Sequence, residues 1–169
     1  MPRLFAQIIS MIVVVIAGFS LIGCACDGRM RSFDVSVQLD PQLRNQTVLV
    51  DLVGVSDPNA EEWDAKSLPE YWRQGDSFRA IQLRDGFVEP MEFVAGSGTM
   101  SKTLDRKNEI WARWKREDAI NLYVITELQS RRFRKAITLD CGRWDEDLKE
   151  LEIRITPDGI FQRQSPNVP

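Results

Sequence analysis

The sequence contains no histidine and only three cysteines among its 169 residues. Without histidine, neither a Ser-His-Asp nor a Cys-His catalytic arrangement can form, and no imidazole can bind a metal. The cysteines are too few for a thiolate metal site, because one of them matches a lipidation signal described below. These absences predict a protein that is not an enzyme and that holds no metal and no cofactor.

The sequence also lacks an excess of basic charge: it has 22 lysines and arginines and 25 aspartates and glutamates, which gives a net charge of −3. A nucleic-acid partner would require a basic face, so we expect no nucleic acid as a partner. The densest acidic group lies between Asp145 and Glu150. It lacks the glycine turn and the ligand spacing of a calcium loop, which predicts a solvated, charged turn.

Long apolar runs are absent except at the N-terminus, where Arg3 is followed by a largely apolar stretch from Leu4 to Leu21. A charged start, an apolar middle and a small-residue exit predict a secretory signal peptide covering residues 1–23. The alternative is a retained transmembrane helix, since about 20 apolar residues span a bilayer.

The run ends in Leu21, Ile22, Gly23 and Cys24, which resemble the lipobox of bacterial lipoproteins. In that family the chain is cut before the cysteine, whose thiol takes a diacylglycerol and whose amino group is often acylated, as with palmitate. The resemblance implies lipidation of Cys24, with each buried methylene adding about 0.8 kcal/mol to the anchor. The expected location is the cell membrane or the outer membrane, with the domain facing the periplasm or the exterior.

Cys26 and Cys141 remain as a candidate disulfide in an oxidising compartment outside the cytoplasm. Such a bond requires that their Cα atoms lie within about 7 Å of each other. The alternative is an exposed thiol at Cys26 and a small apolar residue at a strand end at Cys141.

The rest of the chain is dominated by strand patterns. The segment 33–40 alternates apolar and polar residues, which predicts a half-buried strand, and 47–55 is apolar on both faces, which predicts a central strand. Further strands are expected at 77–83 and 87–94, where Pro90 indicates an edge strand. Two late hairpins, one before and one after the acidic turn, complete seven or eight strands.

Short helices are expected in the segments 57–75 and 105–118, and no βαβ alternation is present. This pattern predicts a mainly β fold, an antiparallel two-sheet sandwich of the transthyretin or immunoglobulin kind with short helical insertions. The expected organisation is a tether at 24–32, a sandwich domain at 33–164 and a disordered tail at 165–169.

Two groups of side chains have both a structural and a functional interpretation. The five tryptophans lie near the ends of predicted elements, which favours core packing, although Trp111 and Trp114 could instead line an aromatic cleft. The basic residues between Arg131 and Lys135 are typical of a solvated strand edge. Contact with anionic headgroups or an acidic partner is the alternative.

The lipobox, the segment "LDPQLRNQTVLVDLVGV" and the late "LYVITEL…RRFRKAITLD" hairpin resemble TssJ, the outer-membrane lipoprotein family of the type VI secretion membrane complex. The rhythm of Val48, Val50 and Leu52 approximates that family's second strand. The helices around Trp63 and Trp72 and the "IWARW" segment do not map onto it. The resemblance implies a transthyretin-like sandwich and a partner-binding loop formed by Pro41, Gln42, Leu43, Arg44, Asn45 and Gln46.

Together these features predict a lipid-anchored envelope lipoprotein that acts as a docking or structural component of a membrane-associated assembly, of the type VI secretion kind. It would contact the membrane through Cys24 and an envelope protein through the loop 41–46. The alternative is a periplasmic lipoprotein that binds a small ligand or a glycan near Trp111 and Trp114.

Overall fold

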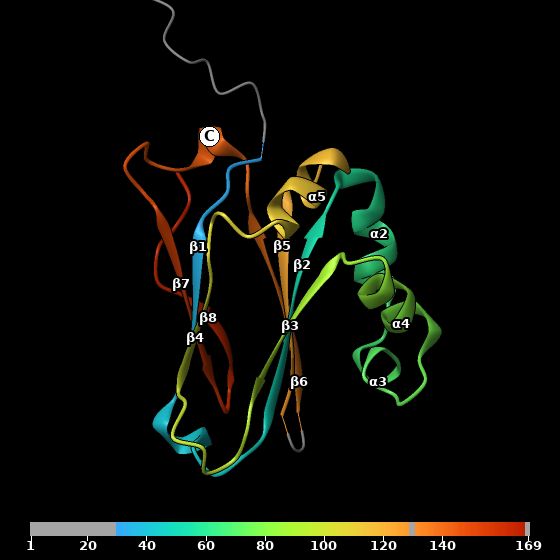
Figure 1. Ribbon diagram of the computed structural model, residues 1–169, viewed down its shortest axis with the longest axis vertical. Helices are drawn as coiled ribbons and strands as arrows, with labels where there is room; N and C mark the ends of the chain where they lie inside the picture. Colours follow the sequence, from blue (N-terminus) through green and yellow to red (C-terminus); the bar gives the residue numbers. More distant parts are fainter. Residues whose placement is uncertain (1–29, 129–130, 168–169) are drawn as a thin grey trace, which may run out of the picture.

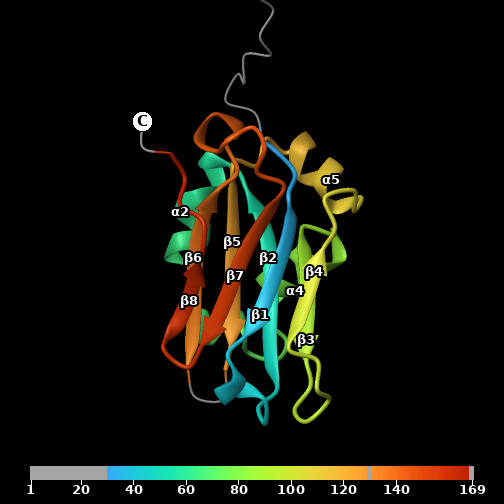
Figure 2. The same cartoon turned by 90° about the vertical axis from the view of Figure 1, so that its left-hand side faces the viewer.

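The computed structural model describes residues 30–128 and 131–167. The predicted signal peptide, Cys24 and Cys26 therefore lie outside the described residues. The described strands form two four-stranded sheets packed face to face, and helices cover the outer surface of one sheet (Figure 1). Turned by 90°, the molecule shows the two layers stacked along the line of sight (Figure 2). The predicted mainly β, two-sheet sandwich is confirmed.

The first sheet has the strand order β4-β1-β7-β8, and the second has the order β3-β2-β5-β6. The strand bounds are β1 Asp34–Leu39, β2 Val48–Val55, β3 Val88–Phe93, β4 Ser101–Leu104, β5 Asn121–Glu127, β6 Arg132–Thr138, β7 Glu150–Thr156 and β8 Gly159–Gln162. The helix bounds are η1 Pro41–Leu43, α2 Asp57–Ala65, α3 Leu68–Tyr71, α4 Ser77–Arg84, α5 Ile110–Arg116 and η2 Cys141–Arg143.

Side-chain alternation explains the main core, which fills the space between the sheets. Val35, Val37 and Leu39 of β1 point inward, as their period of two requires, and all three are buried. Strand β2 contributes Val50 and Leu52 to the same core. Its other face is also buried, because the helical layer covers it, and this explains why the segment is apolar throughout.

A second, smaller core lies between the β2–β5 face and helices α2, α3 and α4. Val53, Trp63 and Tyr123 belong to it, and Trp63 makes edge-to-face contact with the neighbouring aromatic rings. The second core holds the helical insertion against the sheet.

One carboxylate is buried in this second core. Asp51 of β2 is only 1% exposed. It accepts hydrogen bonds from the Tyr71 hydroxyl at 2.7 Å and from the Arg79 guanidinium at 2.7 and 3.1 Å. Burial and the adjacent Asp51 raise the pKa of Tyr71, so Tyr71 stays a hydrogen-bond donor. The network satisfies a charge that burial would otherwise make costly.

One sequence prediction about an individual element is wrong, and one strand was not predicted. The segment predicted as a strand at 77–83 is helix α4, because the Asp76 carboxylate accepts a hydrogen bond from the Arg79 amide and caps the helix. Strand β4 at Ser101–Leu104 is a strand that the sequence patterns did not predict. The edge position of β3, which contains Pro90, is confirmed.

The described parts of the predicted tether and tail pack against the domain. Met30 is buried and forms an isolated antiparallel bridge with Asp140. Near the C-terminus, the Asn167 amide donates to the Arg143 carbonyl, and the Arg143 guanidinium donates to the Asn167 carbonyl. Residues 30–32 and 165–167 therefore lie on the domain rather than hang from it.

Candidate functional site

The described chain enters the sandwich at one end, and the loop 41–46 lies at the other. Met30 is bridged to Asp140, which precedes η2 at the top of Figure 1, whereas η1, the adjoining ends of β5 and β6 and the β7–β8 turn lie at the bottom. We call the first the entry end. We call the second the distal end, formed by residues 41–46, Val94, Leu128, Arg131 and the turn Pro157–Asp158.

The entry end is held together by Arg31. Its amide donates to the Leu139 carbonyl at 2.9 Å, and its guanidinium donates to the carbonyls of Asp145, Glu146 and Leu148. The same guanidinium lies 5.2 Å from the centroid of the Phe33 ring. One side chain thus fastens the incoming chain to the acidic turn, whose carboxylates project into solvent as predicted.

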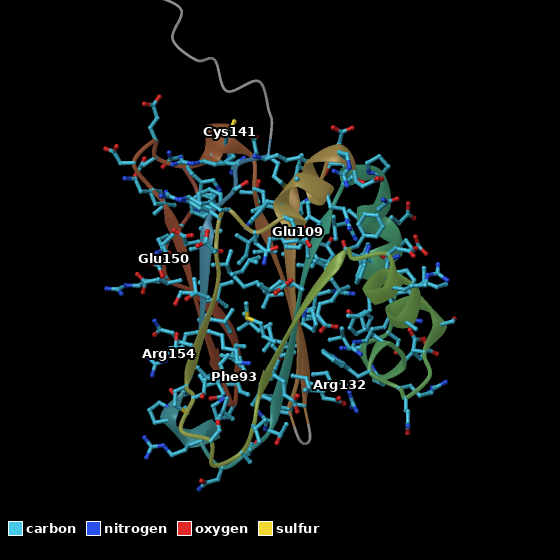
Figure 3. The ribbon with its side chains drawn as sticks, in the orientation of Figure 1. Phe93, Glu109, Arg132, Cys141, Glu150 and Arg154 are labelled. Carbon is cyan, nitrogen blue, oxygen red and sulfur yellow. The ribbon has the colours of Figure 1, made fainter. Side chains whose placement is uncertain are left out.

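Cys141 lies in η2 at this end, and Figure 3 labels it next to the point where the described chain begins. It is disulfide-bonded. Asp140 precedes it, caps η2 through the Gly142 amide at 2.9 Å, and forms the bridge with Met30. Cys26 and Cys24 lie outside the described residues, so the predicted pairing of Cys26 with Cys141 stays a prediction.

Three tryptophans close the entry end of the sandwich: Trp111, Trp114 and Trp144 are all buried. Trp111 and Trp114 meet edge to face with their centroids 4.9 Å apart, and their indole nitrogens donate to the carbonyls of Asp105 and Phe87. A ligand could stack on these rings only by opening the core. The structure therefore contradicts the aromatic cleft proposed for Trp111 and Trp114 and confirms the core-packing interpretation.

At the distal end, the loop 41–46 is tightly organised. Pro41 begins η1, Leu43 is buried as its anchor, and the Gln46 amide donates to the Leu43 carbonyl at 2.9 Å. The Gly96 amide donates to the Arg44 carbonyl at 3.1 Å, which joins this loop to the β3–β4 loop. Pro41, Gln42, Arg44 and Asn45 remain exposed.

Asp40 positions this loop from the end of β1. Its carboxylate accepts a hydrogen bond from the Gln42 amide at 3.0 Å and another from the Arg154 guanidinium at 2.8 Å. These interactions, with the Gln42 amide first, lower the pKa of Asp40. The loop is thus fixed to both β1 and β7 before any partner binds.

A depression of about 270 Å³ opens at the distal end. Leu43, Leu128 and Pro157 contribute apolar surface to it, and Gln46 and Arg131 add polar groups. Arg131 donates to the Pro157 carbonyl at 3.1 Å, so the hairpin of one sheet is linked to the turn of the other. The depression therefore combines parts of both sheets around the predicted partner loop.

Sequence reasoning missed part of this surface. Val94 is 53% exposed although it is β-branched and apolar, and it lies in the loop that is bonded to residues 44 and 47. Leu128 and Pro157 were predicted only as elements of two hairpins. The sequence does indicate a turn after each of these apolar strands. Nothing in the sequence shows that three such turns meet at one end of the sandwich.

Three of the four basic residues of the β5–β6 hairpin have local partners: Arg131, Arg132 and Arg134. The Arg132 guanidinium, labelled in Figure 3, binds Glu127 at 2.8 Å. Arg134 donates to the carbonyls of Trp63, Asp64 and Lys66 at the C-terminal end of α2. This arrangement supports the structural interpretation of these residues over a lipid-binding one.

The outer face of the first sheet also carries a groove, which no sequence argument anticipated. Gln38, Arg154, Phe161 and Arg163 line it, its volume is about 380 Å³, and Phe161 is 54% exposed. Both arginines already bind carboxylates: Arg154 binds Asp40, and Arg163 binds the neighbouring strand's Glu152 at 2.7 Å. None of the residues 41–46 lines this groove.

Among residues 30–128 and 131–167, no cluster of three or more potential metal ligands is present. In the same ranges, none of the helices has the length and apolar character needed to cross a bilayer.

No protein-family model and no curated protein sequence matches the chain. Among solved structures, the chain is similar to Serratia marcescens Lip, described as a membrane-bound component of the type VI secretion system. The match has a TM-score of 0.48 and 12% sequence identity, and it covers 80% of this chain and 98% of Lip. We draw no functional conclusion from a likeness of this size.

Proposed function

We propose that this protein is a lipid-anchored envelope lipoprotein whose distal end docks a protein partner. The observation that carries the proposal is the separation of the two ends. The described chain enters the domain beside η2, and the exposed loop 41–46 lies at the far end of the strands (Figure 1). An anchor before residue 30 would leave the distal end facing away from the membrane.

The anchor itself is supported by sequence chemistry. Cys24 follows an aliphatic residue, a permissive position and a small residue. Cleavage of the Gly23–Cys24 peptide bond would remove residues 1–23 and leave the lipid-bearing Cys24 at the new N-terminus. Two or more acyl chains hold a protein on a bilayer far more stably than one.

The distal end has the features expected of a docking surface. Val94 is exposed in the loop that hydrogen-bonds to residues 44 and 47, and the depression combines apolar with polar side chains, as docking surfaces do. The hydrogen bonds from the Gln42 and Gly96 amides hold the loop in one conformation, which reduces the ordering cost of binding.

We also propose that the protein acts without catalytic turnover. The absence of histidine from the sequence supports this, as do carboxylates such as Asp40 and Asp51 that are engaged by arginines. The sequence resemblance to TssJ implies that the partner belongs to an assembly of the type VI secretion kind.

Two experiments test the proposed function. Cells grown with an alkyne-bearing fatty acid should label the wild-type chain and Cys26→Ser but not Cys24→Ser, because only Cys24 follows the lipobox. Crosslinking in intact cells, followed by mass spectrometry, should recover a specific envelope protein with the wild-type chain. Labelling that survives Cys24→Ser would contradict the anchor, and recovery of no specific protein would contradict docking.

A further inference from the structure

In the described part of the chain, each of the two sheets ends in two edge strands. The edge strands are β4 and β8 in the first sheet and β3 and β6 in the second. Strands β8 and β6 lie on one side of the sandwich, and β4 and β3 lie on the other (Figure 2). An edge strand can pair with a strand of another chain unless charged side chains or proline prevent it.

Three of these four edge strands carry a charged residue that points between the sheets. Lys102 of β4, Lys135 of β6 and Glu89 of β3 each pair across the strands with an apolar residue of the main core. Cross-strand partners point to the same face of a sheet, so these charges face inward. Strand β3 also contains Pro90, which has no N–H to donate. A strand added at any of these edges would bury a charge, which opposes pairing.

Strand β8 has none of these features. Its four residues, Gly159–Gln162, include no charged residue and no proline. Ile160 and Gln162 occupy the inward positions, where they pair with core residues of β7. Among the edge strands within residues 30–128 and 131–167, β8 is therefore the one that an added strand can approach without burying a charge.

The backbone of β8 also offers unused hydrogen-bonding groups. The Arg163 amide donates to the Glu152 carbonyl of β7 at 3.0 Å. The N–H and C=O groups of an antiparallel strand alternate in direction, so those of Phe161 also face β7, whereas those of Ile160 and Gln162 point away from it. No described residue forms a hydrogen bond with these outward groups. An extended polypeptide has N–H and C=O groups at the spacing that matches them.

Side chains on both faces of β8 lack the contacts that a neighbouring strand supplies. On the outer face, Phe161 is 54% exposed and lines the groove of about 380 Å³ together with Gln38 and Arg154. On the inner face, the side-chain nitrogen of Gln162 is buried and has no hydrogen-bond partner in the described part of the molecule. A strand added at this edge would place successive side chains beside Phe161 and beside Gln162.

We infer that β8 receives an extended segment of the docked protein partner, which adds a fifth strand to the first sheet. The inference rests on the proposed function, because β8 follows the turn Pro157–Asp158 of the distal end. Main-chain hydrogen bonds to Ile160 and Gln162 hold the segment, and its alternate side chains give specificity.

The side chains around β8 define the segment that fits. The two arginines of the groove already bind carboxylates, so the position beside Phe161 takes an apolar or aromatic side chain rather than an acidic one. The position beside Gln162 takes a side chain with a hydrogen-bond acceptor, because the amide nitrogen there lacks one.

Photo-crosslinking in intact cells tests this inference with benzoylphenylalanine, an aromatic photo-crosslinking amino acid, placed at Phe161. The matched control carries it at Thr103, which is exposed on the outer face of β4 at the opposite edge of the same sheet. A third protein carries it at Asn45 in the exposed distal loop and reports docking. We expect the proteins substituted at Phe161 and Asn45 to yield adducts with the same envelope protein, and the protein substituted at Thr103 to yield none.

Substitutions of Gln162 test whether the adduct depends on strand addition. Gln162→Lys gives β8 the inward charge that the other edges carry, and Gln162→Pro removes an N–H that points away from β7. Each should abolish the adduct from Phe161 and leave the adduct from Asn45 in place. Gln162→Ala keeps the N–H and adds no charge, so it should retain both adducts. Thermal unfolding checks that each variant is folded, and Gln162→Lys provides the test if proline unfolds β8.

The outcomes separate this inference from the docking function. A Phe161 adduct that survives Gln162→Lys, an equal adduct from Thr103, or no adduct from Phe161 would overturn strand addition while the Asn45 adduct leaves docking intact. An adduct between Phe161 and a second copy of this chain would also overturn it. Absence of adducts from both Phe161 and Asn45 would overturn the docking function as well.

Discussion

The entry end and the distal end of the sandwich differ in which side chains they bury and which they expose. At the entry end, three tryptophans are buried, and Arg31 fastens the incoming chain to backbone carbonyls. At the distal end, Val94 and most of the loop 41–46 stay exposed, and a depression opens beside that loop, although hydrogen bonds organise the loop backbone. The comparison indicates one end built to hold the chain and one built to present a surface.

The largest expected difference in stability between variants at the two ends comes from Trp114, which is completely buried and lies against the backbone of Gly54. Trp114→Ala should lower the free energy of unfolding by about 3–5 kcal/mol, because it leaves a large cavity and an unpaired Phe87 carbonyl. The matched distal variant Val94→Ala should change it by less than about 0.5 kcal/mol. Urea denaturation measures both, and equal losses would remove the contrast between the ends.

Leu43 sharpens the comparison within the distal end, since its buried side chain supports an otherwise exposed loop. Leu43→Ala should cost about 2–4 kcal/mol and should also weaken partner crosslinking, because the loop loses its anchor. Gln42→Ala, at the neighbouring exposed position, serves as the stability control. A loop that tolerates Leu43→Ala without loss of stability would show that it is not anchored as described.

Arg31 and Arg131 offer a matched arginine pair at opposite ends. Arg31→Gln should lower the free energy of unfolding by about 2 kcal/mol, because charged hydrogen bonds to several carbonyls are lost. Arg131 is 59% exposed in its ion pair with Asp158, so Arg131→Gln should cost about 0.5 kcal/mol or less. Thermal unfolding of the two variants compares them directly, and the reverse order would contradict the assigned roles.

The smallest expected effect is the pH dependence at Asp40. Because its pKa is lowered in the folded state, first by the Gln42 amide, ionised Asp40 stabilises the fold above the unfolded pKa of about 4. That stabilisation should be lost as the pH falls through the folded pKa. Asp40→Asn keeps a capping side chain but removes the charge.

The difference in unfolding midpoint between wild type and Asp40→Asn should therefore be constant near neutral pH and shrink below about pH 4. Asp158→Asn removes an exposed distal carboxylate and controls for net charge. A difference that persists unchanged to pH 3 would show that the charge of Asp40 does not stabilise the fold.

Local sequence patterns predicted the elements that depend on side-chain alternation. The strand predicted at 33–40 alternates apolar and polar residues because one face is buried, and the strand predicted at 47–55 is apolar throughout because both faces are buried. The hairpin turn at Pro157–Asp158 follows from the turn preferences of its residues. The segment 77–83 was mispredicted as a strand because the spacing of its apolar residues fits both a strand and a helix, and only the Asp76 cap decides for the helix.

Contacts between distant segments could not be predicted in the same way. Strand β1 pairs in parallel with β7, which brings residues 34–39 beside residues 150–155 without any local signal. The partner loop 41–46 was predicted, but the depression beside it also needs Leu128 and Pro157, from two other turns. The site is a product of topology, which places three turns at one end.

Site-specific photo-crosslinking tests the central claim most directly. A photo-crosslinking amino acid is placed at Asn45 on the distal end or at Glu146 on the entry end, both of which are exposed. After irradiation of intact cells, we expect the Asn45 variant to yield a discrete adduct with an envelope protein and the Glu146 variant to yield no such adduct. Adducts with the same protein from Glu146 and none from Asn45 would contradict the assignment of the distal end as the docking surface.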